Sequence, residues 1–120
     1  MAFLEAHLEE AGCSPKIQME IELAVEEIFS NIANYAYHPG IGDVSIRFEV
    51  ESDPKTAVIT MQDQGQPYDP LSKEDPDVTL SVEDRSIGGL GIYLTKKTMD
   101  DIKYEYRDGS NILTMKKKLI

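Results

Sequence analysis

The sequence predicts an α+β fold, a two-layer sandwich with helices on one face of a mostly antiparallel sheet. In the first third of the chain, apolar residues recur every three or four positions, as in amphipathic helices. Later, two pairs of segments alternate apolar and polar residues, which predicts hairpins, and one helical segment separates them. A chain of 120 residues suits a single domain, residues 1–120.

Two helices are expected before the first hairpin. The first covers residues 2–11 and stops at Gly12. The second begins at the Ser-Pro pair 14–15, which supplies an N-cap and a proline at the first helical position. Its apolar residues keep helical spacing over 17–33, and the His-Pro-Gly sequence at 38–40 ends it.

Alternation predicts a first hairpin from strands at 44–51 and 56–63. A closing hairpin is expected from strands at 102–107 and 111–120, because an Asp-Gly turn separates them. A third helix is expected over 92–101, between the two hairpins.

Residues 64–87 follow a different pattern from the rest of the chain. They contain three prolines and many acidic residues but few large apolar side chains. A loop of this length in a compact domain predicts a lid or a binding loop.

The charge balance limits the classes of partner. The chain has 22 acidic and 12 basic residues, a formal net charge of −10. Nucleic acid and anionic membrane surfaces would be repelled, so neither is expected as a partner. Cys13 is the single cysteine, so no internal disulfide is expected, and we find no transmembrane or signal-peptide pattern. The sequence therefore favours a cytoplasmic protein.

The first candidate site lies on the second helix. At helical spacing Glu27, Asn31 and Asn34 fall within roughly 60° of one another, at the edge of the apolar stripe. Carboxylate and amide oxygens suit Mg²⁺, and the carboxylate could instead act as a general base. The simpler interpretation is a solvated helix face.

The second candidate site is Asp63-Gln64-Gly65, at the end of a predicted strand. A carboxylate here can accept a hydrogen bond from the exocyclic amino group of adenine, and so discriminate against guanine. The glycine would let the backbone approach a flat ring. An ordinary turn is the alternative, because Asp-x-Gly is common in turns.

The third candidate site is the glycine-rich run 87–91, which leads into the third helix. Free N–H groups and the positive end of a helix dipole attract an anion, and Arg85 could add a contact to phosphate. The run is neither a Walker loop nor a dinucleotide fingerprint, because the residues that follow and surround it differ. A flexible hinge is the alternative.

Taken together, AVEEIFSNIANYAY, DQGQPYDP and DRSIGGLGIYLTKKTMDDIKYEYRDGSN resemble the ATP-binding domain of the gyrase–Hsp90–histidine kinase–MutL superfamily. The resemblance extends from about Cys13 to Ile120. Within the superfamily the chain is most similar to the bacterial anti-sigma factor and serine/threonine kinase branch, whose members regulate sigma factors by partner switching. The resemblance implies a Bergerat-type ATP-binding fold with its ATP lid at about 64–87.

The resemblance also implies roles for individual residues. Glu27 matches the general base for the acceptor serine hydroxyl, and Asn31 matches the Mg²⁺ ligand. Asp63 matches the aspartate that receives the adenine amino group, and Gly65 matches the glycine beside the ring. The other residues expected to bind ATP are Asn34, Arg85, Gly88, Gly89, Leu90, Gly91 and Thr114.

Parts of the sequence depart from the family pattern or match it loosely. Asn34 is neutral where the wider superfamily often has a basic residue, and Pro67 replaces the second glycine of the first glycine box. Ser110, Asn111 and Thr114 lie near the last strand, where the family often places a hydroxyl close to adenine.

The resemblance implies a kinase that uses ATP and Mg²⁺ to phosphorylate an anti-anti-sigma (STAS-type) partner, or that binds this partner or a sigma factor. Relatives also form homodimers, but the strand that usually opens the domain is absent here, which weakens that expectation. One alternative is a nucleotide-gated binding module without phosphoryl transfer. Two others are a detached histidine kinase catalytic domain and an α+β domain with none of these activities.

Overall fold

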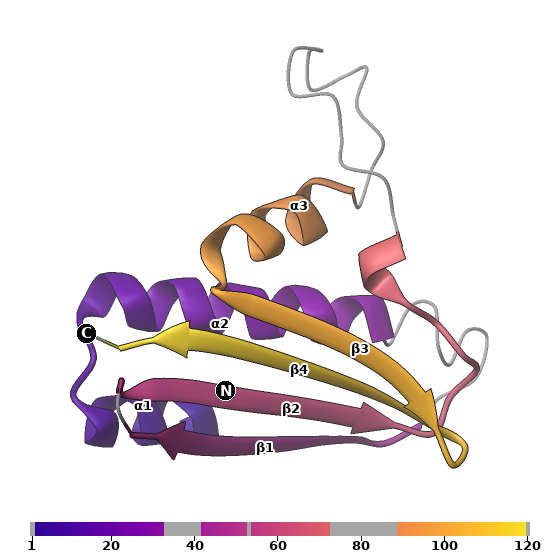
Figure 1. The fold of residues 1–120 in the computed structure, drawn as a ribbon, viewed down its shortest axis with the longest axis horizontal. Coiled ribbons are helices and arrows are strands. Elements are labelled where there is room, and N and C mark those ends of the chain that lie inside the picture. The colour runs from indigo at the N-terminus through magenta and orange to yellow at the C-terminus, as the bar shows by residue number, and fades with distance from the viewer. Residues whose placement is uncertain (1, 33–41, 53, 73–88, 120) are drawn as a thin grey trace.

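In the described part of the chain, four strands form one antiparallel sheet in the order β1-β2-β4-β3. In the view of Figure 1, α1 and α2 lie behind this sheet and α3 lies above its β3 edge. This computed structural model describes residues 2–32, 42–52, 54–72 and 89–119. It confirms the predicted α+β class. The elements are α1 (Ala2–Ala11), α2 (Pro15–Asn31), β1 (Val44–Glu51), β2 (Thr56–Asp63), the 3₁₀ turn η2 (Pro70–Ser72), α3 (Gly89–Thr98), β3 (Asp101–Arg107) and β4 (Ser110–Lys118).

The predicted end of the first helix and the predicted start of the second are confirmed by their caps. Gly12 follows α1 with φ of +75°, a left-handed conformation that glycine adopts without strain. The Ser14 hydroxyl accepts a hydrogen bond from the Ile17 N–H at 3.2 Å, and Pro15 occupies the first turn of α2. Helix α2 ends at Asn31, and the predicted continuation over 33–41 lies outside the described residues.

The prediction of the third helix over 92–101 was wrong at both ends. Helix α3 begins at Gly89, because the glycines interpreted as a loop already form its first turn. It ends at Thr98, because the chain then joins the sheet: the Asp100 N–H donates to the Lys116 carbonyl at 2.9 Å. Pairing with β4 therefore outweighs the helical spacing of the residues after Thr98.

The core lies between the helices and one face of the sheet. Alternate residues of the two central strands point to this face, as the period of a strand requires. Helices α1 and α2 cover them with their own apolar residues. The most deeply buried side chains are Leu4, Leu8, Ile21, Val25, Ile28, Ile59, Met61, Ile92 and Met115.

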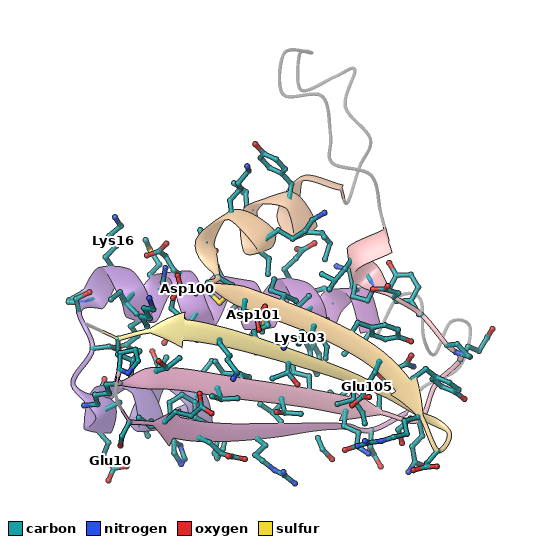
Figure 2. All side chains as sticks on the ribbon, in the orientation of Figure 1. Glu10, Lys16, Asp100, Asp101, Lys103 and Glu105 are labelled. Carbon is teal, nitrogen blue, oxygen red and sulfur yellow. The ribbon has the colours of Figure 1, made fainter. Side chains whose placement is uncertain are left out.

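The other face of the sheet is open to solvent. Figure 2 labels Asp101, Lys103 and Glu105 along β3, where they alternate with residues of the helix-facing side. Lys103 lies 3.8 Å from Asp101, and both side chains are well exposed, so this ion pair adds little to stability. None of the described helices is long and apolar enough to span a membrane.

Three element ends meet at one edge of the fold. Strand β2 ends at Asp63, directly opposite Asn111 near the start of β4. Helix α2 ends at Asn31 on the same side of the molecule, and the segment after β2 runs from the sheet toward that helix end (Figure 1). The first two candidate sites are therefore brought to the same end of the sandwich.

Candidate functional site

Asp63 forms the centre of one polar cluster at this end. Its side chain is only 2% exposed. Its Oδ1 atom accepts the Gly65 N–H and the Asn111 Nδ2–H, each at 2.9 Å. Among the described residues both bonds fall on Oδ1, which leaves the Oδ2 lone pairs for a donor on a ligand. The Gly65 contact forms an Asp-x-Gly turn, the alternative that the sequence left open, and the place of Gly65 beside a flat ring stays a prediction.

Asn111 is a member of this cluster that the sequence pattern does not single out. It is 4% exposed, and its amide also donates to the Gln66 carbonyl at 2.8 Å. Its Oδ1 accepts the Tyr68 N–H at 3.0 Å and the Tyr104 hydroxyl. The register Asp63↔Asn111 brings the two side chains together, and only strand pairing reveals it.

Tyr104 supplies a hydroxyl that remains protonated at neutral pH. Burial raises the pKa of the Tyr104 phenol above its usual value of 10.0, and the charges of Asp69 and Asp63 raise it further. The hydroxyl therefore remains a donor to Asn111 across the physiological range.

Glu27 and Asn31 form a second cluster, one helical turn apart on α2. The Asn31 amide donates to the Glu27 carbonyl at 2.8 Å and to Glu27 Oε1 at 3.0 Å. Asn31 is 4% exposed, so its orientation is held inside the protein. With both amide hydrogens directed at Glu27, its Oδ1 atom turns away from that carboxylate.

Gly91 brings the backbone of α3 against the Glu27 carboxyl group. A Cβ atom built on Gly91 would overlap the Glu27 Cδ and both carboxylate oxygens. A residue with any side chain would therefore displace the carboxylate. The resemblance implies that Gly91 binds phosphate, and the structure shows that Gly91 also contacts the Glu27 carboxyl group.

Tyr68 links the two clusters. Its backbone N–H donates to Asn111 Oδ1 at 3.0 Å, and its hydroxyl donates to Asn31 Oδ1 at 3.2 Å. A continuous set of hydrogen bonds therefore runs from Asp63 through Asn111, Tyr68 and Asn31 to Glu27. The structure thus joins the first and second candidate sites into one polar network.

Thr114 does not join this network. It pairs with Thr60 and Lys103, three residues along β4 from Asn111. An odd spacing along a strand reverses the side-chain direction, so Thr114 belongs to the exposed face of the sheet. Its predicted place near the ligand is therefore not supported.

The third candidate site is described only in part. Gly89, Leu90 and Gly91 form the first turn of α3, where backbone N–H groups have no partner within the helix. Asn34, Arg85 and Gly88 lie outside the described residues, as does most of the predicted lid at 64–87.

A groove of about 400 Å³ is lined by residues of α2 and α3. Met19, Leu23 and Leu94 line it, and each is more than half exposed. Glu27 and Gly91 contribute to the same lining. A molecule that enters this groove can therefore reach the Glu27 carboxylate.

Comparison with known proteins adds independent findings. A family profile described as a histidine kinase-like ATPase domain matches residues 1–117. The serine/threonine-protein kinase BtrW of Bordetella bronchiseptica is 28% identical over 102 residues, which cover 85% of this chain and 71% of BtrW. The serine-protein kinase RsbW of Bacillus cereus is 32% identical over 101 residues, which cover 81% of this chain and 62% of RsbW. This chain thus spans less than two thirds of the length of that RsbW.

The fold is also found in a solved structure. Acinetobacter baumannii histidine kinase AdeS matches with a TM-score of 0.55 at 20% sequence identity. The match covers 85% of this chain and 47% of the AdeS chain. At this identity the likeness concerns the fold alone.

Proposed function

Because the chain belongs to the histidine kinase-like ATPase domain family, we propose that it binds Mg-ATP and phosphorylates a serine or threonine of a protein partner. The observation that carries this proposal is the pairing of the Glu27 carboxylate with the Asn31 amide, against the backbone of α3. Similarity to the kinases BtrW and RsbW supports it. The partner we propose is an anti-anti-sigma (STAS-type) protein, and we propose a sigma factor as a second protein that the chain binds.

The residues fit a magnesium-bound nucleotide. Within the described ranges no group of three or more His, Cys, Asp and Glu residues could hold a metal by itself. The donor set is instead a buried amide oxygen on Asn31 beside the Glu27 carboxylate. Mg²⁺ keeps several waters and takes one or two protein oxygens together with substrate phosphates, so this small set suits it. The ion would neutralise charge on the transferred phosphoryl group.

The adenine end would be recognised by Asp63. Its Oδ2 atom would accept a hydrogen bond from the exocyclic amino group, while Oδ1 remains held by Gly65 and Asn111. Guanine carries an oxygen at that position, which would face the carboxylate without a proton between them. We therefore propose that the site prefers ATP to GTP. The first turn of α3 would meet the phosphates with its N–H groups and the positive end of its dipole.

In the transfer step, Glu27 would act as the general base. Its Oε1 atom is engaged by the Asn31 amide at 3.0 Å, so Oε2 would accept the proton of the partner's hydroxyl. The hydroxyl oxygen would form a bond to the γ-phosphorus as the bond to the β,γ-bridging oxygen breaks, and ADP would leave with that electron pair. The products are a phosphorylated side chain, ADP and a protonated Glu27.

A phosphotransfer assay with a matched pair of variants tests this function. Purified protein is mixed with γ-labelled ATP and a candidate STAS-type partner. We expect Glu27→Gln to lower the transfer rate by about 10²- to 10⁴-fold, the range for loss of a general base, with ATP affinity almost unchanged. Glu26→Gln, one residue away and exposed, is expected to transfer at the wild-type rate.

Three outcomes would contradict parts of the proposal. Equal transfer by wild type and Glu27→Gln would show that Glu27 is not the base. ATP binding without any transfer would favour the nucleotide-gated binding module. A folded wild-type protein that ignores Mg-ATP at millimolar excess, with no rise in its unfolding temperature, would exclude both functions.

A further inference from the structure

Tyr68 makes hydrogen bonds at both ends of the proposed nucleotide site. Its backbone N–H reaches Asn111, 43 residues away in the sequence, at 3.0 Å. Its hydroxyl reaches Asn31, 37 residues away in the opposite direction, at 3.2 Å. One residue therefore connects the carboxylate proposed for adenine to the amide proposed for Mg²⁺.

The Asn31 amide has one orientation that satisfies all of these contacts. Its nitrogen donates to the carbonyl and to Oε1 of Glu27, so its oxygen is directed to the Tyr68 hydroxyl. A flipped amide would set its oxygen against the Glu27 carbonyl and carboxylate, which can only accept hydrogen bonds. The Glu27 contacts thus fix which way the amide faces, and the Tyr68 hydroxyl holds its oxygen by a further hydrogen bond.

The position of this hydroxyl is itself well defined. The Tyr68 side chain is partly buried and packs against the hydrophobic core. Its backbone is held by the Asn111 amide, which in turn bonds to Asp63 at 2.9 Å. The phenol therefore extends from an anchored ring and an anchored main chain, as expected of a group that orients another.

We propose that Tyr68 is a positioning residue for the metal ligand, holding the Asn31 amide oxygen in the orientation that receives Mg²⁺. A carbonyl oxygen has two lone pairs and can accept a hydrogen bond while it binds a cation, so the bond from the Tyr68 hydroxyl is compatible with ligation of Mg²⁺. Outer-shell hydrogen bonds of this kind orient metal ligands, and their loss lowers metal affinity about 10- to 100-fold. The inference rests on the proposed function, since it assigns the residue that supports its metal ligand.

The test compares nucleotide affinity with and without the metal. ATP binding is measured by calorimetry in excess Mg²⁺ and again in EDTA, and the ratio of the two dissociation constants gives the gain due to Mg²⁺. Tyr68→Phe keeps the ring and its packing but removes the hydroxyl. We expect this variant to lose at least about tenfold of the magnesium gain, while its affinity in EDTA stays within about twofold of wild type.

Tyr104→Phe is the matched control, because it also removes a phenol hydroxyl from the network. That hydroxyl bonds to Asn111 at the adenine end and not to Asn31. Its loss is expected to change ATP affinity by the same factor in Mg²⁺ and in EDTA, and so to leave the magnesium gain unchanged.

A magnesium gain in Tyr68→Phe equal to that of wild type would overturn the inference. A larger gain would also overturn it, because it would show that the hydroxyl competes with the metal. Wild-type protein that binds no ATP would instead refute the proposed function, so the two failures are distinguishable.

A second measurement keeps both the ring and the hydroxyl of residue 68. Site-specific incorporation of 3-fluorotyrosine at position 68 gives a single ¹⁹F resonance beside Asn31. This resonance is expected to shift when Mg²⁺ is added to the ATP complex. No shift at saturating Mg²⁺ would overturn the inference even if Tyr68→Phe failed to fold.

Discussion

The two ends of the polar network are built in different ways. At one end Asp63 and Asn111 are 48 residues apart in sequence and meet only because β2 pairs with β4. At the other end Glu27 and Asn31 are four residues apart and meet because both lie on one turn of α2. The first end therefore depends on strand register, and the second on helical periodicity.

The two ends also differ in what packs against their carboxylates. Asp63 is met by hydrogen-bond donors on one oxygen, while Glu27 is met by one donor, the Asn31 amide, and also by the bare backbone of Gly91. A carboxylate held by donors is sensitive to loss of its charge. A carboxylate held against a glycine is sensitive to added volume at that glycine. The four predictions below test this difference.

The largest effect is expected from Asp63→Asn. The substitution removes the charge and replaces one carboxylate oxygen with an NH2 group, so this donor faces either the Gly65 and Asn111 donors or the adenine amino group. We expect ATP affinity to fall by at least about 1,000-fold, as for sites that lose a required hydrogen-bond partner. Calorimetric titration measures it, and Asp101→Asn, an exposed carboxylate on β3 (Figure 2), is the control. Binding of ATP by Asp63→Asn at wild-type affinity would remove Asp63 from the site.

Gly91→Ala is expected to affect the transfer step without harming the fold. The added Cβ displaces the Glu27 carboxylate, and a misplacement of about 1 Å can lower a rate by about 100-fold. The atoms that must move are the end of a flexible side chain, and alanine favours a helix by about 1 kcal/mol over glycine. The unfolding free energy is therefore expected to change by less than about 1 kcal/mol.

A double-mutant cycle shows whether Gly91 acts through Glu27. In a Glu27→Ala background the carboxylate is absent, so adding Gly91→Ala should cause no further loss of transfer. An equal loss in both backgrounds would mean that the glycine serves the phosphates alone.

A pair of substitutions on β4 tests the assignment of its two faces. Asn111→Ala removes hydrogen bonds to Asp63 and to the segment that contains Tyr68, and is expected to weaken ATP binding by about tenfold. Thr114→Ala changes the exposed face beside Thr60 and Lys103, and a change of less than about twofold is expected. A larger effect at Thr114 than at Asn111 in the same binding assay would reverse the assignment.

The smallest effect is expected in the dependence of stability on pH. The folded-state pKa of Tyr104 is raised by burial, so the folded protein retains this proton more strongly than the unfolded chain. The contribution to stability is complete below the unfolded value of 10.0 and is lost as pH rises through the folded value. Urea unfolding between about pH 9 and pH 11 should therefore show a steeper loss of stability in wild type than in Tyr104→Phe. Parallel curves for the two proteins would contradict the prediction.

Much of the fold could be predicted from local patterns. The alternation of apolar and polar residues predicted the first hairpin, 44–51 and 56–63, and the structure has both strands at these bounds. Capping signals predicted the end of α1 and the start of α2. The third helix was misplaced, because glycines favour loops in an isolated segment and the pairing of Asp101 with Lys116 is not a local property.

The sequence by itself determined the helical spacing that puts Glu27 and Asn31 on one turn. It also determined the alternation of the strand that ends at Asp63. Such features depend on neighbours within a few residues, so a linear pattern contains them. Tertiary structure alone decided that Asn111 and not Thr114 meets Asp63, that Gly91 contacts Glu27, and that Tyr68 joins the two ends. These contacts join residues far apart in the chain, and they depend on strand register and on the packing of α3 against α2, which no local pattern specifies.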